Sequence, residues 1–413
     1  MPSRRALLAG AAGLTAAGGL AETVHLGAVT APEPPPDTWP QARYGPANTA
    51  GNPDVVVPDD PSIDWQTVEL PQSYDTTVVV GPETVYLGGA GIAAFDRGSG
   101  TRQWQEAAPG HFLSLANGVL FGASRSTPPG FEPGTIGPVA IDVETGSLRW
   151  QADGQTRIYH LIAGRDALYV GDHGRFLAFD RQTGRQRWAV TRGYDAETYP
   201  MIHDGSLYGG LERLVRFESR SLLDLATVSG PSMRWETDYF DEMDPPAASD
   251  EIVVFGQYHH TIAAESRPGL IAFDAHSGER LWDAVTPRPD DDRLEVGSPA
   301  IAESEGFVGI RNGSDETQQY AVAGLDLRTG EVRWRTAVDQ RVWHLAVGRD
   351  VVIVGTAAPR DSAREQKGSI RALDRSDGRE RWHIPTESPV SSLALVDGTI
   401  FTSTVRGGLL ALR

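Results

Sequence analysis

The sequence predicts an all-β protein, an eight-bladed β-propeller made of four-stranded antiparallel blades. Three observations support this fold class. A short motif recurs along the chain, tryptophans follow one another at similar intervals, and each interval has room for about four short strands. In such repeat architectures each unit buries its apolar surface against its neighbours, so the ring has to close on itself.

The recurring motif reads small–x–Asp–x–x–Ser/Thr–Gly–x–x–x–Trp, and its clearest copy runs from Ala178 to Trp188. The apolar residues before Asp180 favour a strand, and an aspartate there can accept hydrogen bonds from amides two residues on, which starts a turn. Gly184 can adopt the positive φ that most residues resist. Each copy therefore predicts a strand, a tight turn and a second strand whose tryptophan is covered by the next repeat.

The tryptophan series sets the number of blades. Its members are Trp65, Trp104, Trp150, Trp188, Trp235, Trp282, Trp334 and Trp382. A lone strand around Trp65 precedes the first full repeat, and three strands without a tryptophan follow Trp382. We expect the strand near Trp65 to pair with the C-terminal strands and close the ring, which gives eight blades. The alternative count is seven.

The repeat resembles the tryptophan-docking motif of the PQQ-binding-like β-propellers, and the resemblance covers residues 61–413. This family includes the quinoprotein dehydrogenases and a non-enzymatic propeller lipoprotein of the bacterial β-barrel assembly machinery. The resemblance implies the fold, but the motif is structural and leaves the function open. A dehydrogenase of this family would hold PQQ at the channel mouth over Ca²⁺, with an aspartate as base and often a vicinal cysteine pair beside the cofactor.

The chain is strongly acidic. It has 55 Asp and Glu against 37 Lys and Arg, a formal net charge of −18, and its basic residues are almost all arginine. An acidic surface with few lysines is typical of a halophilic protein, because such a surface holds water and keeps the protein soluble. Nucleic acid is not expected as a partner, since its binding requires a basic surface. We expect a monomer.

Residues 1–31 are predicted to be a twin-arginine signal peptide. Arg4 and Arg5 precede an apolar run that falls short of the ~20 residues a membrane span requires. We expect export by the twin-arginine route to the cell surface or the extracellular space, with a retained N-terminal anchor as the alternative. Residues 32–60 are rich in proline and are predicted to be a linker. The stretch around Trp39 is expected to pack on the outside of the ring.

One candidate site follows from aligning the blades on the residue that ends the second strand of each one. Polar residues then stand where each innermost strand begins, and they should ring the mouth of the central channel. The candidate channel-mouth residues are His111, Tyr159, His160, Thr198, Ser298, Trp343 and His344. Such residues can also simply line a water-filled funnel. We expect no metal at the three histidines, because the blade of His344 lies across the channel from the other two.

A second candidate site lies on the long loops that join the second and third strands of blades five to seven. Insertions in repeat proteins tend to gather on one face, which is often the binding face. The candidate partner-binding residues on these loops are Tyr258, His259, His260, Arg311, Arg360 and Arg364. Loops also lengthen without any functional consequence, and this alternative stays open.

Two functions remain open. The first is an exported, non-catalytic scaffold that binds a protein or a small molecule through its loop face and needs no cofactor. The alternative is a PQQ-dependent quinoprotein dehydrogenase with PQQ and Ca²⁺ at the channel mouth. We favour the scaffold, because the chain has no cysteine, no recognisable Glu/Asn/Asp calcium set, and no catalytic-serine, phosphate-loop or zinc motif that would mark catalytic residues.

Overall fold

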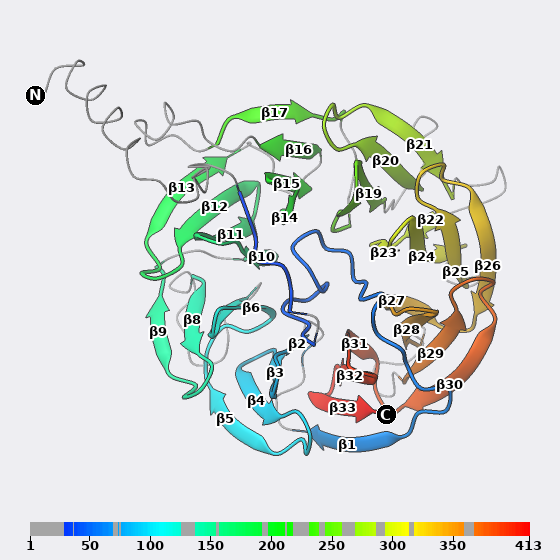
Figure 1. Ribbon diagram of the computed structural model, residues 1–413, viewed down its shortest axis with the longest axis horizontal. Coiled ribbons are helices and arrows are strands. Elements are labelled where there is room, and N and C mark those ends of the chain that lie inside the picture. The colour runs from blue at the N-terminus through cyan, green and yellow to red at the C-terminus, as the bar shows by residue number, and fades with distance from the viewer. Residues whose placement is uncertain are drawn as a thin grey trace, which may run out of the picture.

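Figure 1 shows a computed structural model of the chain. The structure describes residues 29–413 apart from internal gaps. The residues outside the description are 1–28, 36, 69–72, 74–75, 125–136, 154–156, 192–196, 211–212, 218–230, 239–243, 258–268, 286–293, 314–317 and 359–366. In the described part every regular element is a β-strand. No helix there is long and apolar enough to cross a membrane.

The strands form eight antiparallel sheets arranged as the blades of a propeller, and blades one to four follow the chain around the ring (Figure 1). Blade one contains β2 (Thr77–Val80), β3 (Thr84–Gly88), β4 (Ile92–Asp96) and β5 (Arg102–Glu106). Blade two contains β6 (Phe112–Ala116), β7 (Val119–Ala123), β8 (Val139–Asp142) and β9 (Leu148–Gln151). Blade three contains β10 (His160–Ala163), β11 (Ala167–Asp172), β12 (Arg175–Asp180) and β13 (Gln186–Thr191). Blade four contains β14 (Tyr199–His203), β15 (Ser206–Gly210), β16 (Leu214–Phe217) and β17 (Met233–Glu236).

Blades five to seven continue the ring, and in blade six two short strands, β22 and β23, both pair with β24. Blade five contains β18 (Ala247–Ser249), β19 (Ile252–Gly256), β20 (Leu270–Asp274) and β21 (Arg280–Ala284). Blade six contains β22 (Leu294–Val296), β23 (Ala300–Ala302), β24 (Glu305–Asn312), β25 (Gln319–Asp326) and β26 (Val332–Val338). Blade seven contains β27 (Arg341–Val347), β28 (Val351–Ala357), β29 (Gly368–Asp374) and β30 (Glu380–Thr386).

Blade eight closes the ring with strands from both ends of the chain. It contains β31 (Val390–Val396), β32 (Thr399–Thr404), β33 (Gly408–Leu412) and β1 (Ile63–Val68). The first strand pairs antiparallel with the last, with Trp65 opposite Ala411. The predictions of eight four-stranded blades and of a closing strand near Trp65 are therefore confirmed, with β22 and β23 together forming the innermost strand of blade six.

The tryptophans dock each blade onto the next, and the contact of Trp150 with blade three shows how. The turn aspartate, Asp180, accepts hydrogen bonds from the amide and the hydroxyl of Thr183, both at 3.0 Å. Gly184 has a φ of +69°, and a Cβ placed there would lie 2.5 Å from the Trp150 ring. The indole nitrogen of Trp150 donates to the carbonyl of Arg181 at 2.9 Å. The same ring-on-glycine contact joins Trp65 to Gly100, Trp104 to Gly146, Trp235 to Gly278, Trp282 to Gly330 and Trp334 to Gly378.

Residues 37–52 run through the middle of the ring (Figure 1), and we call them the channel segment. Their backbone hydrogen-bonds to the end of the innermost strand in one blade after another. The bonds join Trp39 to Val80, Pro40 to Leu115, Pro46 to Ile202, Ala47 to Ala248, Thr49 to Ile301 and Ala50 to Val347 at 2.6 to 3.0 Å. The expectation that the stretch around Trp39 packs on the outside of the ring is therefore wrong.

The physical reason lies in the innermost strands. Each one is the edge of its sheet and presents unpaired N–H and C=O groups to the channel, where a buried group without a partner is costly. The channel segment supplies those partners and adds apolar packing. Trp39 is completely buried, with its ring 5.0 Å from that of Tyr44. The buried amides of Asn48 and Asn52 donate to the carbonyls of Pro200 and Leu395.

Candidate functional site

A cavity of about 490 Å³ opens at the mouth of the channel, on the face where the innermost strands begin. We call it the cup. All eight blades contribute to its wall, and the channel segment contributes Ala42 and Arg43. The channel segment thus closes the cup at one end.

Arg43 brings a positive charge to the base of the cup. Its Nε donates to the carbonyl of Asn48 at 3.2 Å, and its Nη2 donates to the carbonyl of Pro299 in the interrupted inner edge of blade six. Burial lowers the pKa of Arg43 to about 10, and the carboxylate of Asp244 partly opposes this shift. Arg43 therefore stays charged at neutral pH.

His160 and His344 face the cup as neutral imidazoles. Burial, helped by the charge of Arg43, lowers the pKa of His160 to about 3 and that of His344 to about 4. Neither ring nitrogen of His160 has a hydrogen-bond partner among the described residues. Its ring lies between those of Phe112 and Tyr199, with centroid separations of 6.3 and 6.4 Å. The neutral imidazoles of His160 and His344 can therefore accept or donate a hydrogen bond to a bound molecule without carrying charge.

The charged lining also contains Arg341 and two carboxyl groups, those of Glu197 and Asp244. Burial raises the pKa of Asp244 to about 7, although Arg43 and Arg341 act in the opposite direction. At neutral pH Asp244 is therefore divided between a protonated form, which can donate a hydrogen bond, and an ionised form. The hydroxyl of Tyr199 donates a hydrogen bond to Glu197, so the carboxylate of Glu197 is oriented by another residue of the cup wall.

The structure brings together most of the channel-mouth residues that the sequence predicts. His111, Tyr159, His160, Ser298, Trp343 and His344 all line the cup. Thr198 does not, because it is completely buried while its two neighbours in the chain face the cavity. Tyr159 is held by His173, whose Nε2 lies 2.8 Å from the Tyr159 hydroxyl.

Sequence reasoning missed the charged groups of the cup. Arg43 was missed because its segment was expected outside the ring, and no periodic signal marks it. Glu197, Asp244 and Arg341 lie within a few residues of the aligned positions, in the connections that lead into the innermost strands. Extending the alignment by three residues toward the N-terminus would have included all three.

The predicted wall of long loops falls mostly outside the described residues, and Tyr258, His259, His260, Arg360 and Arg364 are among the residues that are not described. Arg311 is described, and it lies in an internal ion pair. Its Nη1 is 2.6 Å from Glu295, which also pairs with Arg341 at 3.0 Å.

The charged lining of the cup is a poor match for a PQQ–calcium pair. Ca²⁺ favours carboxylates among its about six to eight oxygen ligands, whereas the lining offers two carboxyl groups, one of them with a pKa raised to about 7 beside the cationic Arg43. Across the described part of the chain, no group of three His, Cys, Asp or Glu side chains is placed to hold a metal ion.

The fold and the docking contacts define an eight-bladed propeller of the tryptophan-docking class with a cup at its channel mouth. The chain belongs to the PQQ_2 family, described as outer membrane protein assembly factor BamB, whose model matches residues 88–206 and 139–413. No curated protein sequence matches the chain.

Solved structures share the fold at low sequence identity. BamB from Moraxella catarrhalis is 14% identical with a TM-score of 0.61, and the match covers 86% of this chain and 98% of that one. The quinohemoprotein alcohol dehydrogenase ADHIIG from Pseudomonas putida HK5 is 11% identical with a TM-score of 0.65, over 94% of this chain and 82% of that one. A europium-containing methanol dehydrogenase is 13% identical with a TM-score of 0.60, over 90% of each chain.

Proposed function

We propose that the protein is an exported, non-catalytic β-propeller that acts as a binding or assembly scaffold and takes a ligand into the cup. The cup itself is the observation that carries this proposal. Its volume of about 490 Å³ lies within the range of small-molecule pockets, about 300–1,000 Å³, and such pockets combine apolar walls with a few converging polar groups. The matching family is named for an assembly factor, which supports a scaffold over an enzyme.

The lining indicates a small, polar molecule that contains a ring. Aromatic side chains of Phe112, Tyr159, Tyr199 and Trp343 supply flat surfaces against which a ring can pack. Arg43 supplies a fixed positive charge for an acidic group on the ligand. The neutral histidines and the partly protonated Asp244 add hydrogen-bonding groups that cost little to desolvate.

The alternative is a PQQ-dependent dehydrogenase, and the donor set of the cup disfavours it. Export by the twin-arginine route to the cell surface or the extracellular space remains part of the proposal. It rests on the Arg4–Arg5 pair, the apolar run after it and the acidic composition that suits a salt-rich exterior.

Native mass spectrometry of protein purified from its own host tests the proposal. We expect a retained small molecule of defined mass that is lost from a Trp343→Ala variant and kept by a His203→Ala variant, because His203 is the last residue of β14, at the end away from the cup. Retention by Trp343→Ala, or no bound molecule in the wild type, would contradict binding in the cup. Tight uptake of added PQQ and Ca²⁺ with dye-linked alcohol oxidation would establish the dehydrogenase instead.

A further inference from the structure

Three blades carry an arginine directly after the turn aspartate of the repeat: Arg97, Arg181 and Arg375. Each contacts the turn between the first and second strands of the preceding blade. In blade seven, Nη2 of Arg375 donates to the carbonyl of Ala302 at 3.1 Å, and Nη1 donates to the carbonyl of Arg349 at 3.0 Å. This position therefore joins two blades on the face opposite the cup.

At two of these junctions the preceding blade supplies carboxylates for the arginine. Nε of Arg375 lies 2.6 Å from Glu305 and Nη2 lies 2.8 Å from Glu303. Nη2 of Arg97 lies 3.4 Å from Asp397, which occupies the same turn position as Glu303. The arginine and its counterions thus come from different blades.

The junction between blades two and three keeps the arginine and lacks the acids. Nη2 of Arg181 donates to the carbonyl of Ala116 at 3.2 Å, and Nη1 donates to that of Arg165 at 2.8 Å, as in blade seven. The positions of Glu303 and Glu305 are held by Asn117 and Val119, as the strand registers show. Nε of Arg181 is buried and has no hydrogen-bond partner in the described structure.

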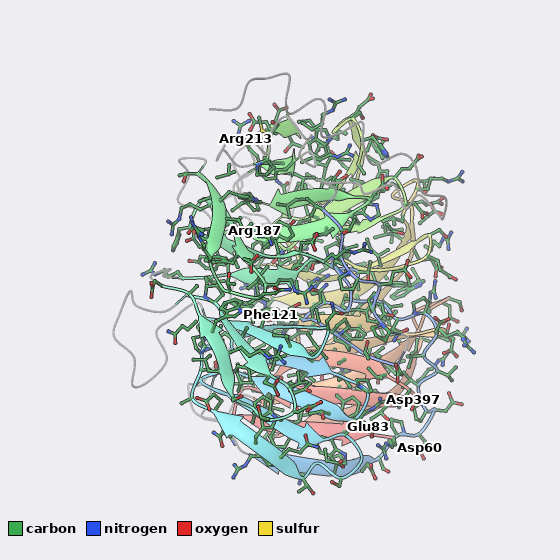
Figure 2. All side chains as sticks on the ribbon, turned by 60° about the vertical axis from the view of Figure 1, so that its left-hand side comes forward. Asp60, Glu83, Phe121, Arg187, Arg213 and Asp397 are labelled. Atoms are coloured by element: carbon green, nitrogen blue, oxygen red, sulfur yellow. The ribbon has the colours of Figure 1, made fainter. Side chains whose placement is uncertain are left out.

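A cavity of about 450 Å³ occupies the place of the missing carboxylates. Its charged lining consists of Arg149, Arg165, Arg181 and Arg187 with Asp166 and Asp180. Arg149 and Arg187 each pair with the turn aspartate of their own blade, Asp142 and Asp180, at 2.5 and 2.6 Å. Phe121 and Arg187, labelled in Figure 2, come from the two blades that border this cavity. With Asp142 counted as the partner of Arg149, four arginines stand against three aspartates, which leaves an excess of positive charge in a chain whose net charge is −18.

Glu305 of blade six shows how a carboxylate occupies the equivalent position between two blades. Its carboxylate bridges two arginines, Arg333 of its own blade at 2.8 Å and Arg375 of the next blade at 2.6 Å. Arg149 and Arg181 hold the corresponding positions around the cavity. We propose that the groove between blades two and three binds an oxyanion, a carboxylate or a phosphate group, which bridges Arg149 and Arg181 in place of the missing glutamate. Charge-assisted bonds to guanidinium groups are the natural contacts for such an anion.

Isothermal titration of the folded protein with sodium phosphate, and separately with sodium acetate, tests the proposal at low ionic strength, where screening is weak. We expect one equivalent of at least one anion to bind to the wild type. Asn117→Asp supplies the acid found at Glu303 and Asp397, and we expect it to weaken binding about tenfold or more. Aspartate suits this position, because Asn117 has a φ of +51° and Asp397 has one of +50°. Saturation by phosphate alone would define a phosphate site, and saturation by acetate would define a carboxylate site.

A reciprocal variant gives a gain of binding. The double variant Glu303→Asn/Glu305→Val reproduces both residues of blade two in blade six and should raise the stoichiometry from one anion to two. A melting curve for each variant shows that it is folded. No saturable binding of either anion to the wild type, or unchanged binding to Asn117→Asp, would overturn the proposal.

Discussion

Replacing His160 with phenylalanine should make the protein more resistant to acid. Burial and the charge of Arg43 lower the pKa of His160 from 6.5 to about 3 in the folded state. In the unfolded chain the imidazole titrates near its ordinary value, so unfolding takes up a proton once the pH falls below about 6.5. The contribution of His160 to stability is therefore complete above that pH and is lost progressively as the pH falls toward 3.

The size of the effect follows from the pKa shift. Each pH unit between the two pKa values changes the free energy of unfolding by about 1.4 kcal/mol, so a fall to pH ~5 costs about 2 kcal/mol. Phenylalanine keeps a ring between Phe112 and Tyr199 and cannot take up a proton. The difference in unfolding free energy between His160→Phe and the wild type should thus shift by about 2 kcal/mol in favour of the variant between pH ~7.5 and ~5.

Urea unfolding followed by tryptophan fluorescence at several pH values measures this difference. The titration of Asp244 and of surface carboxylates contributes to both proteins and cancels to first order in the comparison. His344→Phe should behave in the same way, because the pKa of His344 is lowered to about 4. Curves of stability against pH that run parallel for wild type and His160→Phe would refute the claim that the cup holds its histidines neutral.

Two further predictions concern the blade junctions and the channel segment. Gly330→Ala should lower the free energy of unfolding by about 3 kcal/mol and Gly118→Ala by only about 1 kcal/mol. Both glycines have φ above +70°, but only a Cβ at position 330 would lie within 2.7 Å of a ring, that of Trp282. Equal losses in urea unfolding would show that the tryptophan contact does not tighten the junction. Trp39→Ala should cost about 3–5 kcal/mol, because the side chain is completely buried, and a loss below about 1 kcal/mol would contradict its packing inside the ring.

The ring was predictable because each repeat carries its own turn chemistry. Asp180 and Gly184 determine a turn whatever surrounds them, and a tryptophan at a fixed spacing needs a neighbouring sheet to cover it. The closing strand could be predicted because a lone strand with a tryptophan precedes the first full repeat, and the last three strands lack one. Together they make one complete blade. Because each repeat carries these local features, counting the repeats predicts the number of blades without any knowledge of long-range contacts.

The channel segment could not be predicted in the same way. It binds the ring mainly through backbone carbonyls, such as those of Pro40 and Thr49, and many sequences could supply these. Its proline-rich composition therefore looks like that of a solvated linker. The prediction of the cup is incomplete for the same reason. The alignment of the blades finds residues such as His160 and Trp343 on the wall, whereas the charge of Arg43 comes from a segment that does not repeat.

A designed disulfide tests most directly whether the channel segment lies inside the ring. Gln41 and Ser114 face each other across an antiparallel bridge, and the native chain has no cysteine to compete. In Gln41→Cys/Ser114→Cys, refolded in a glutathione redox buffer, we predict a cross-link that lowers the mass by about 2 Da. The control Gln41→Cys/His203→Cys should not form it. Two free, fully alkylated thiols in the folded Gln41→Cys/Ser114→Cys protein would contradict the placement of the segment and, with it, the closed cup.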